Sequence, residues 1–271
     1  MPLRMGLCML VTSSLAILAL IVTLWQSSET VLSQVKKVLP PNRSGEEFPD
    51  RTTSQKVNDR PSFLDIALKH GTDKVTTHHY NYMYDKYLEP LRDQRIKVLE
   101  IGLGCNMGYG PGAPYHTWLE YFTNVDLYFI EYDAACAEKW KAETTGATIF
   151  TGDQADAAFL DRFLSETGGN FDIMIDDGGH TMQQQMTSLE TLFKAVVPGG
   201  IYFCEDLATS YEEQYGGGDG KTTMMGMIKE LLDDLNHAVE GRPDVKHQVG
   251  SEMRSIECGE QICAFFKEDS R

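Results

Sequence analysis

Two clusters of acidic residues, one of them followed by a histidine, are the groups in this sequence best suited to chemistry. Residues 176–180 read Asp-Asp-Gly-Gly-His, and a second acidic pair, Glu205-Asp206, follows a later apolar segment. Adjacent carboxylates repel each other unless a cation or a proton lies between them. All the ligand atoms that these two acidic pairs offer are oxygens. Oxygen ligands favour a hard cation such as Mg²⁺ or Ca²⁺ over zinc. His180, on the turn after Asp177, is placed to act as a general base beside that cation. The alternative is that His180 caps the following helix and that the acids are merely solvated.

A glycine-dense turn lies upstream of these acids, between residues 96 and 112. Its apolar run, 98–101, predicts a buried parallel strand that carries an acid at Glu100. Gly102 and Gly104 follow directly, and residues without a Cβ allow the backbone to approach a ligand closely. A dinucleotide-binding turn has the pattern G-x-G-x-x-G, but Met107 stands where the third glycine would be. An acid before such a turn suits a cationic ligand without phosphate, which indicates S-adenosylmethionine. The alternative is an ordinary turn between a strand and a loop.

Further polar residues follow the second and third predicted strands. Glu131 ends the second strand and is placed to accept hydrogen bonds from ribose hydroxyls. Asp153 and Gln154 follow the third strand and could contact an adenine edge, although Asp153 could equally be a helix N-cap. Ligands of parallel α/β sheets bind at the carboxyl ends of the strands. We therefore expect the cofactor to contact Glu100, Gly102, Gly104, Glu131, Asp153 and Gln154.

From residue 96 onward, predicted strands and helices alternate, which is typical of a doubly wound α/β fold. The predicted strands are 96–101, 125–131, 147–151, 171–175 and 201–205, and the helices include 115–122, 182–197 and 224–236. Two closing strands near 254–257 and 262–267 indicate an antiparallel C-terminal hairpin. The sequence thus predicts a mostly parallel, seven-stranded sheet preceded by N-terminal helices that begin near residue 61. His78 and His79, in that helical segment, are interpreted as surface or capping residues.

The N-terminal residues are predicted to form a transmembrane segment. Residues 5–28 contain no charged side chain, and a helix needs about 20 apolar residues to cross a bilayer. A cleaved signal peptide is the alternative, but no small-x-small cleavage site is clear after residue 25. Residues 29–60 are polar and have no sustained apolar period, as in a flexible stem. We therefore predict a membrane anchor at 1–28, a stem at 29–60 and a catalytic domain at 61–271.

The orientation in the membrane has two conflicting indications. Lys36, Lys37 and Arg43 follow the apolar segment whereas Arg4 alone precedes it, so the positive-inside rule favours a cytosolic catalytic domain. The tripeptide 42–44, Asn-Arg-Ser, is a glycosylation sequon that would be used only in the lumen. The predicted localisation is therefore a membrane, with the cytosolic side favoured and the lumenal side still open.

Composition limits the partners of the protein. The 24 basic and 40 acidic residues give a formal net charge of -16, which repels a nucleic-acid backbone and excludes nucleic acid as an expected substrate. The six cysteines include no C-x-x-C pair, and Cys258 with Cys263 is the one plausible disulfide, across the predicted hairpin. Mostly free thiols are expected, which favours a reducing compartment. The oligomeric state is not indicated.

Several motifs resemble known methyltransferases. The strand and turn at 99–104, Leu-Glu-Ile-Gly-Leu-Gly, and the acid that ends the second strand are similar to the class I S-adenosylmethionine-dependent methyltransferases. The segments 71–74, 118–122, 175–180 and 205–211 look like the macrolide-sugar O-methyltransferases, which, like the cephalosporin-hydroxylase-like proteins, bind Mg²⁺ beside the cofactor. The resemblance covers about residues 61–267 and implies a class I, Rossmann-like fold. It also implies that Asp177 and Asp206 bind the metal, with Glu205 as a possible third ligand, and that His180 is the base.

These observations predict an S-adenosylmethionine-dependent, Mg²⁺-assisted O-methyltransferase. Its substrate would be a hydroxyl of a small molecule, either a secondary metabolite or a sugar-like acceptor. One alternative is an inactive membrane scaffold with a methyltransferase fold, although such a protein has no reason to retain two self-repelling acidic pairs beside His180. The other is an NAD-dependent oxidoreductase, which the absent third glycine disfavours.

Overall fold

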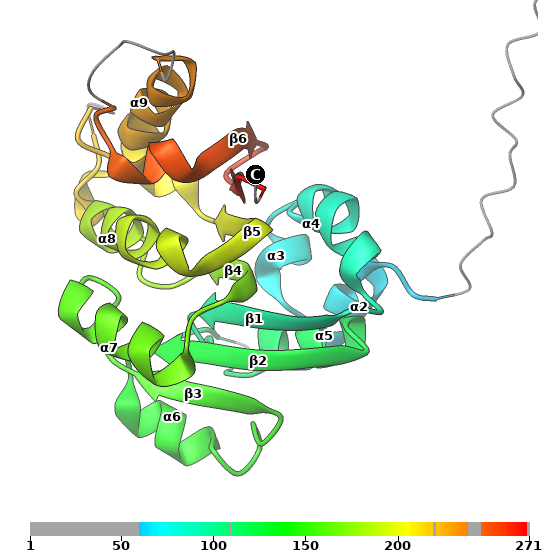
Figure 1. The fold of residues 1–271 in the computed structure, drawn as a ribbon. Helices are drawn as coiled ribbons and strands as arrows, with labels where there is room; N and C mark the ends of the chain where they lie inside the picture. The colour runs from blue at the N-terminus through cyan, green and yellow to red at the C-terminus, as the bar shows by residue number, and fades with distance from the viewer. Residues whose placement is uncertain (1–59, 109, 219–220, 238–244, 270–271) are drawn as a thin grey trace, which may run out of the picture. The chain divides into compact units, whose positions relative to one another are not determined.

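A mixed seven-stranded β-sheet forms the centre of the computed structural model, which describes residues 60–108, 110–218, 221–237 and 245–269 (Figure 1). The strands in chain order are β1 (Arg95–Ile101), β2 (Asn124–Glu131), β3 (Ala147–Thr151), β4 (Phe171–Asp176), β5 (Val196–Cys204), β6 (Met253–Cys258) and β7 (Cys263–Lys267). Their spatial order is β3-β2-β1-β4-β5-β7-β6. The first five are parallel, whereas β7 pairs antiparallel with both β5 and β6. The predicted sheet and its C-terminal hairpin are confirmed.

Strands β1 and β4 lie side by side, and the strands that follow each of them in the chain are added on opposite sides of this pair. After β1 the sheet grows outward through β2 and β3, and after β4 it grows through β5 on the other side. Such a reversal opens a crevice at the carboxyl ends of the strands, where ligands of open α/β sheets bind. The register places Ile101 beside both Ile130 and Asp176. The segments that leave β1, β2 and β4 therefore start at the same edge.

Helices cover both faces of this sheet because each face is apolar. On one face, α2 (Phe63–His70), α4 (Asn81–Leu88) and α5 (Ala113–Tyr121) pack their aromatic side chains against β1 and β2. On the other face, α7 (Ala157–Thr167), α8 (Met182–Leu192) and α9 (Met224–His237) enclose a second apolar core. Figure 1 shows α7 and α8 on the side of the sheet opposite α2 and α5. The short helices α3 (Asp73–Thr76) and α6 (Ala134–Trp140) lie after α2 and β2 in the chain.

One predicted boundary is wrong. The helix expected at 182–197 ends at Leu192, and a single 3₁₀ turn at Phe193–Ala195 leads directly into β5. The run Pro198-Gly199-Gly200 lies inside β5, where the pairing with β4 shifts register between Phe171 and Ile173. Proline and glycine are tolerated at such an irregularity in a strand. This run therefore marks a break in the strand pairing and not the end of a helix.

The predicted localisation at a membrane has to be corrected. No helix within the described residues is long enough and apolar enough to cross a bilayer. The predicted anchor at residues 1–28 lies outside the described residues, and so does the predicted stem up to residue 59. The proposed division of the chain at residues 28 and 60 stays a prediction.

The expectation of mostly free thiols is also wrong. Cys258 and Cys263 form the disulfide that their positions suggested, but Cys105 and Cys136 form a second one. Among the described cysteines only Cys204, which is buried, is free. The second pair was missed because its members are 31 residues apart. With two disulfides present, the argument for a reducing compartment loses its support.

Candidate active site

A cavity of about 750 Å³ lies at the carboxyl edge of the sheet. Ligand pockets in proteins typically measure about 300–1,000 Å³, so a cofactor and part of a substrate would fit. One part of the lining, here called the glycine wall, consists of residues 102 and 104–107 after β1 and of residues 130–133 at the end of β2. Another part, the histidine wall, consists of residues 177–180 after β4 and 206, 208, 209 and 212 after β5, together with Asp73 and His78.

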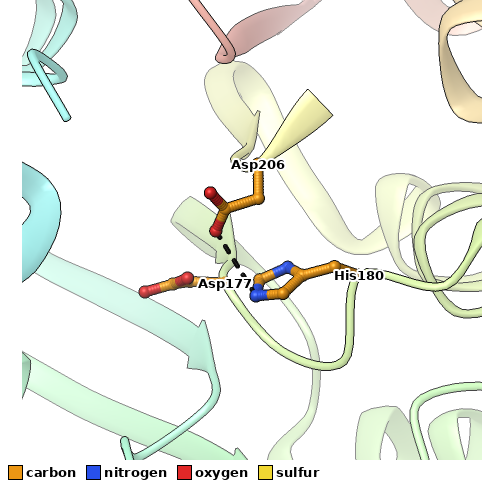
Figure 2. Close-up of side chains that lie close together, drawn as sticks. All are labelled: Asp177, His180 and Asp206. Carbon is orange, nitrogen blue, oxygen red and sulfur yellow. Dashed lines mark ion pairs between the residues drawn. The ribbon is translucent and has the colours of Figure 1, made fainter. Parts of the chain in front are cut away.

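Three side chains of the histidine wall converge. One ligand atom from each of Asp177, His180 and Asp206 lies within 4.8 Å of the others. His180 Nε2 and Asp206 Oδ2 are 3.3 Å apart (Figure 2). In Figure 2 the Asp206 carboxylate points toward the imidazole, whereas the Asp177 oxygens are directed away from the ring in this view. The two carboxylates offer oxygen ligands, which fit a hard divalent cation, and the imidazole lies beside them.

Backbone geometry at this group departs from ordinary loop conformations. His180 and Asp206 each have φ of 55°, in the left-handed region. Non-glycine residues seldom adopt this region, and at functional sites the surrounding structure holds them there. Thr181 then caps α8 with its hydroxyl, and Gln184 completes the capping box. His180 is therefore not the cap of α8, as the alternative had it, but the residue immediately before it.

Glycines allow the turns after β1 and β4 to come close together. The Asp177 amide donates to the carbonyl of Ile101 at 3.1 Å. A Cβ on Gly102 would overlap the Asp177 carbonyl, and one on Gly178 would overlap the side-chain oxygen of Gln154. Larger residues at these two positions would push Asp177 away from the sheet edge.

Asp206 is held by residues that precede the sheet in the sequence. The Tyr80 hydroxyl donates to Asp206 Oδ1 at 3.1 Å and accepts from the Asp206 amide at 3.1 Å. His78 Nε2 lies 3.4 Å from the same Oδ1, and its ring stacks on Tyr80 with centroids 4.7 Å apart. His78 thus lines the cavity, although the sequence interpretation had placed it among surface or capping residues. Only the tertiary fold brings it to Asp206, and its local sequence carries no signal of that.

A buried lysine lies behind the histidine wall. Lys74 is 1% exposed, and its Nζ contacts three carboxylates: Asp177 at 2.6 Å, Glu205 at 2.8 and 2.9 Å, and Glu100 at 3.0 Å. Burial disfavours the ammonium form, but the three carboxylates together raise the pKa of Lys74 well above its usual value. Lys74 therefore carries a positive charge beneath the converging carboxylates.

Glu205 belongs to this lysine cluster and not to the converging group. Both of its oxygens accept from Lys74, and Oε1 also accepts from the Tyr84 hydroxyl. Burial and the neighbouring Asp177 charge raise the pKa of Glu205, against the opposing effect of Lys74. Its carboxylate is thus bound within the protein by Lys74 and Tyr84.

Glu100 lies in the same cluster and does not line the cavity. Its carboxylate accepts from Trp118 Nε1 at 2.6 Å and lies 3.0 Å from Lys74. Complete burial raises its pKa to about 7. The structure therefore places Glu100 beneath the site, where it supports Lys74, and not beside the space for a ligand.

The other residues expected to contact a cofactor divide between the cavity and its supports. Gly102, Gly104, Glu131 and Gln154 line the cavity, whereas Asp153 does not. Asp153 Oδ1 instead accepts from the Ala155 amide at 2.8 Å, and because Asp156 is the N-cap of α7, the capping role considered as the alternative for Asp153 is also wrong.

Glu131 and Gln154 are both held by hydrogen bonds within the protein. Glu131 accepts from the amides of Leu103 at 3.0 Å and Asp133 at 2.8 Å. Gln154 donates to Asp176 and Ser188 and accepts from the Gly179 amide. Gln154 thus joins the turns after β3 and β4, and its amide group is occupied by the protein.

Asp176 points to the opposite side from Asp177. Gln154 and the Tyr202 hydroxyl donate to its carboxylate. Because the side chain is fully buried, its pKa rises to about 6. Successive residues of a strand alternate between the faces of a sheet. Asp176 is therefore bound within the protein, whereas Asp177 lines the cavity.

Comparisons with known proteins show similarity to sugar O-methyltransferases. No family model matches the chain. The chain is 36% identical over 186 residues to an O-methyltransferase from Streptomyces olivaceus that acts at the 2'-position of 8-demethyl-8-alpha-L-rhamnosyl tetracenomycin C. It is 33% identical over 187 residues to demethylmacrocin O-methyltransferase from Streptomyces fradiae. These matches cover 66% of this chain but 47% and 45% of the relatives, so the chain spans about half of their length.

A solved structure is similar to this chain as well. MycE methyltransferase from the mycinamycin biosynthetic pathway, in complex with Mg, SAH and mycinamycin VI, superposes with a TM-score of 0.68 at 28% identity. The match covers 78% of this chain and 56% of MycE. The predicted resemblance to the macrolide-sugar O-methyltransferases is confirmed. The chain has the class I methyltransferase fold.

Proposed function

We propose that this chain is an S-adenosylmethionine-dependent O-methyltransferase that acts on a hydroxyl of a small molecule with the help of Mg²⁺. The observation that carries the proposal is the convergence of Asp177, His180 and Asp206 in the cavity that the glycine wall also lines. The similarity to sugar O-methyltransferases and to a structure that holds Mg and SAH supports it. The acceptor we expect is a secondary metabolite or a sugar-like molecule.

We propose that the glycine wall binds the cofactor. Gly102 and Gly104 expose their backbone to the cavity, with φ of 100° and 82°. The carboxylate of Glu131 is oriented by two backbone amides, and each of its oxygens retains capacity to accept from a ribose hydroxyl. Of the residues predicted from the sequence, Gly102, Gly104 and Glu131 keep this assignment. Glu100, Asp153 and Gln154 are assigned supporting roles, since the amide group of Gln154 is bound to Asp176, Ser188 and Gly179.

Asp177 and Asp206 are the carboxylates that we assign to the metal. When bound there, Mg²⁺ would act as a Lewis acid toward the hydroxyl oxygen of the acceptor. Lys74 already occupies one oxygen of Asp177, and Tyr80 orients the carboxylate of Asp206. Glu205 is left out of the proposed ligand set because both of its oxygens accept from Lys74.

We assign the role of general base to His180. His180 lines the cavity, its Nε2 lies 3.3 Å from Asp206 Oδ2, and its Nδ1 is buried without a hydrogen-bond partner in the described structure. A neutral imidazole at this position can take the proton of a hydroxyl that approaches Asp177 and Asp206. Removal of the proton leaves the oxygen as the nucleophile for the cofactor's methyl group. The two walls contribute further to the rate by holding the acceptor and the cofactor in line.

Charge in the cavity restricts the acceptor. The described lining includes the side chains of Asp73, Glu131, Asp133, Asp177, Asp206 and Glu212, and it includes no Lys or Arg. Phosphate groups are usually bound by Arg, Lys or a helix N-terminus. The acceptor is therefore neutral or cationic, and the pyrophosphate of NAD is disfavoured on the same ground.

Cofactor binding and product mass test the proposal. The full chain should bind S-adenosylhomocysteine but not NAD in titration calorimetry. After incubation with labelled S-adenosylmethionine, Mg²⁺ and small-molecule extracts, mass spectrometry should detect an acceptor that has gained one methyl group. Binding of NAD in place of S-adenosylhomocysteine would overturn the assignment, and cofactor binding without any methylated product would favour an inactive scaffold.

The metal assignment has its own test. Asp177→Asn should abolish both the dependence on Mg²⁺ and turnover, because a neutral amide is a poor ligand for a hard cation. Asp153→Asn is the matched control, since Asp153 does not line the cavity and an amide oxygen can still accept from Ala155. Activity that survives a chelator in the wild-type protein would contradict the metal assignment and leave the fold unaffected.

A further inference from the structure

The glycine wall contains a covalent link to which the proposed function assigns no role. Cys105 lies in the turn after β1 and lines the cavity. Cys136 lies in the first turn of α6, which follows β2. Their disulfide joins Cα atoms that are 6.1 Å apart in space and 31 residues apart in the sequence. The bond therefore connects the two segments from which the wall is built.

Hydrogen bonds connect the same two segments close to the strands. The Gly102 amide donates to the Ile130 carbonyl at 2.8 Å, and the Leu103 amide donates to Glu131 at 3.0 Å. Further from the strands, the turn after β1 bonds to itself, from Met107 to Gly104 at 3.1 Å. The disulfide at Cys105 thus continues the series of cross-links outward, beyond the last of these hydrogen bonds between the segments.

The far end of the disulfide is itself fixed relative to Glu131. The Asp133 amide donates to Glu131 Oε1 at 2.8 Å, and Asp133 Oδ1 accepts from the Cys136 amide at 3.0 Å. These bonds tie the first turn of α6 to the carboxylate that we assign to the ribose. Through the disulfide, the position of Cys105 is then set with respect to the same carboxylate.

The turn after β1 requires such a restraint because of its composition. Residues 102–112 include five glycines, at positions 102, 104, 108, 110 and 112. Glycine loses more conformational freedom on ordering than any other residue. If a binding site is ordered only part of the time, its apparent affinity for the ligand is reduced. The apparent affinity is proportional to the fraction of molecules in which the site is already in its binding conformation. A cross-link that removes open conformations of the turn raises that fraction.

We infer that Cys105 and Cys136 are positioning residues whose disulfide preorganises the glycine wall for S-adenosylmethionine. The inference rests on the proposed function, since that function names the ligand. In the oxidised protein the turn is held in its binding conformation, and in the reduced protein it must be ordered by the cofactor. The affinity for the cofactor therefore depends on this disulfide and not on the one in the C-terminal hairpin.

The second disulfide provides a matched control. Cys258–Cys263 closes a hairpin with a sequence separation of 5 and does not join the segments of the glycine wall. We compare full-length Cys105→Ser/Cys136→Ser with Cys258→Ser/Cys263→Ser in titrations with S-adenosylhomocysteine. The first variant should bind about tenfold more weakly, a difference of about 1.4 kcal/mol, and the control should stay within about twofold of wild type.

Two further readouts separate positioning from general loss of structure. The affinity for Mn²⁺, measured by its paramagnetic resonance signal, should be unchanged in Cys105→Ser/Cys136→Ser because Asp177 and Asp206 lie on the other wall. In the ligand-free variant, hydrogen exchange should increase at residues 102–107 and not in β4 or β5. A weakened Mn²⁺ site, or exchange that increases everywhere, would overturn the inference in favour of a structural role.

Reversible reduction covers the case in which the double variant folds poorly. In the Cys258→Ser/Cys263→Ser background, a mild reductant should lower the affinity for S-adenosylhomocysteine about tenfold, and reoxidation should restore it. Affinity that does not respond to reduction, or an equal loss in both double variants, overturns the inference. If the wild-type protein does not bind S-adenosylhomocysteine at all, the proposed function fails, and the exchange experiment alone decides whether the disulfide orders the turn.

Discussion

The two walls of the cavity are held in place by different forces. The glycine wall is built from segments that leave adjacent parallel strands, and backbone hydrogen bonds to Ile130 and Glu131 hold it together with one disulfide. The histidine wall depends on side chains from distant parts of the chain: Lys74 and Tyr80 reach Asp177 and Asp206 from the helical segment before the sheet. The glycine wall is thus held mainly by backbone hydrogen bonds, and the histidine wall is held mainly by contacts between charged and polar side chains.

The difference fits what each wall has to bind. A wall that contacts a cofactor along its length needs a fixed surface, which glycine turns and backbone bonds supply. A wall that collects carboxylates around a cation must balance repulsion, and the buried ammonium of Lys74 does this for Asp177, Glu205 and Glu100. The comparison therefore predicts that mutations in the histidine wall change chemistry or stability strongly, whereas mutations in the glycine wall change affinity moderately.

The largest effect is expected from His180→Ala. Loss of the general base should lower turnover by about 10²–10⁴ and leave binding of S-adenosylhomocysteine and Mn²⁺ intact. His79→Ala is the control, because the His79 side chain is 66% exposed and the cavity lining does not include it. A His180→Ala protein with the wild-type rate would remove the chemical distinction between the walls.

Lys74→Met should have the next largest effect. Removal of the ammonium leaves three buried carboxylates without their cation, so the free energy of unfolding should fall by about 3–5 kcal/mol. Lys86→Met breaks an ion pair with Glu257 at the surface and should cost about 0–1 kcal/mol. Chemical denaturation measures both. Equal losses for the two variants would contradict the view that charge holds the histidine wall.

Glu100→Gln tests the same cluster through pH. The pKa of Glu100 is raised to about 7 in the folded protein, from 4.5, so the folded state binds the proton more tightly than the unfolded state. Stability from this group is full below pH 4.5 and falls as the pH rises toward 7, by about 3 kcal/mol in total. Relative to wild type, Glu100→Gln should therefore become more stable across this window in denaturation series. If the stability difference between the variant and wild type does not change with pH, the ionisation of Glu100 in this window is excluded.

The smallest effect is expected in the glycine wall. Glu131→Ala leaves the amides of Leu103 and Asp133 without their acceptor and removes the proposed contact to the ribose. We expect S-adenosylhomocysteine to bind about 1–3 kcal/mol more weakly, with the affinity for Mn²⁺ unchanged. Glu138→Ala, at a solvent-exposed position on α6, should have no effect in the same titration. Unaltered affinity in Glu131→Ala would overturn its assignment to the cofactor.

Much of the glycine wall could be predicted from local sequence. A short apolar run followed by glycines predicts a buried strand and a close turn, because both depend on a few neighbouring residues. The same reasoning located Glu131 at the end of β2, and the paired acids after β4 and before α8. It did not separate the members of each pair. Asp176 and Glu205 turned out to be bound inside the protein, since successive residues at a strand end point to different sides.

The sequence by itself determined the order of strands and helices, the glycine turn and the acids that follow the strands, because these follow from periodicity and from short-range backbone preferences. The tertiary structure alone decided that Lys74 lies between three carboxylates, that His78 and Tyr80 meet Asp206, and that Cys105 pairs with Cys136. Each of these contacts joins residues many positions apart, and their distance depends on how the sheet and its helices pack. Local sequence carries no record of that packing, so the partners of a buried charge become visible only in the folded chain.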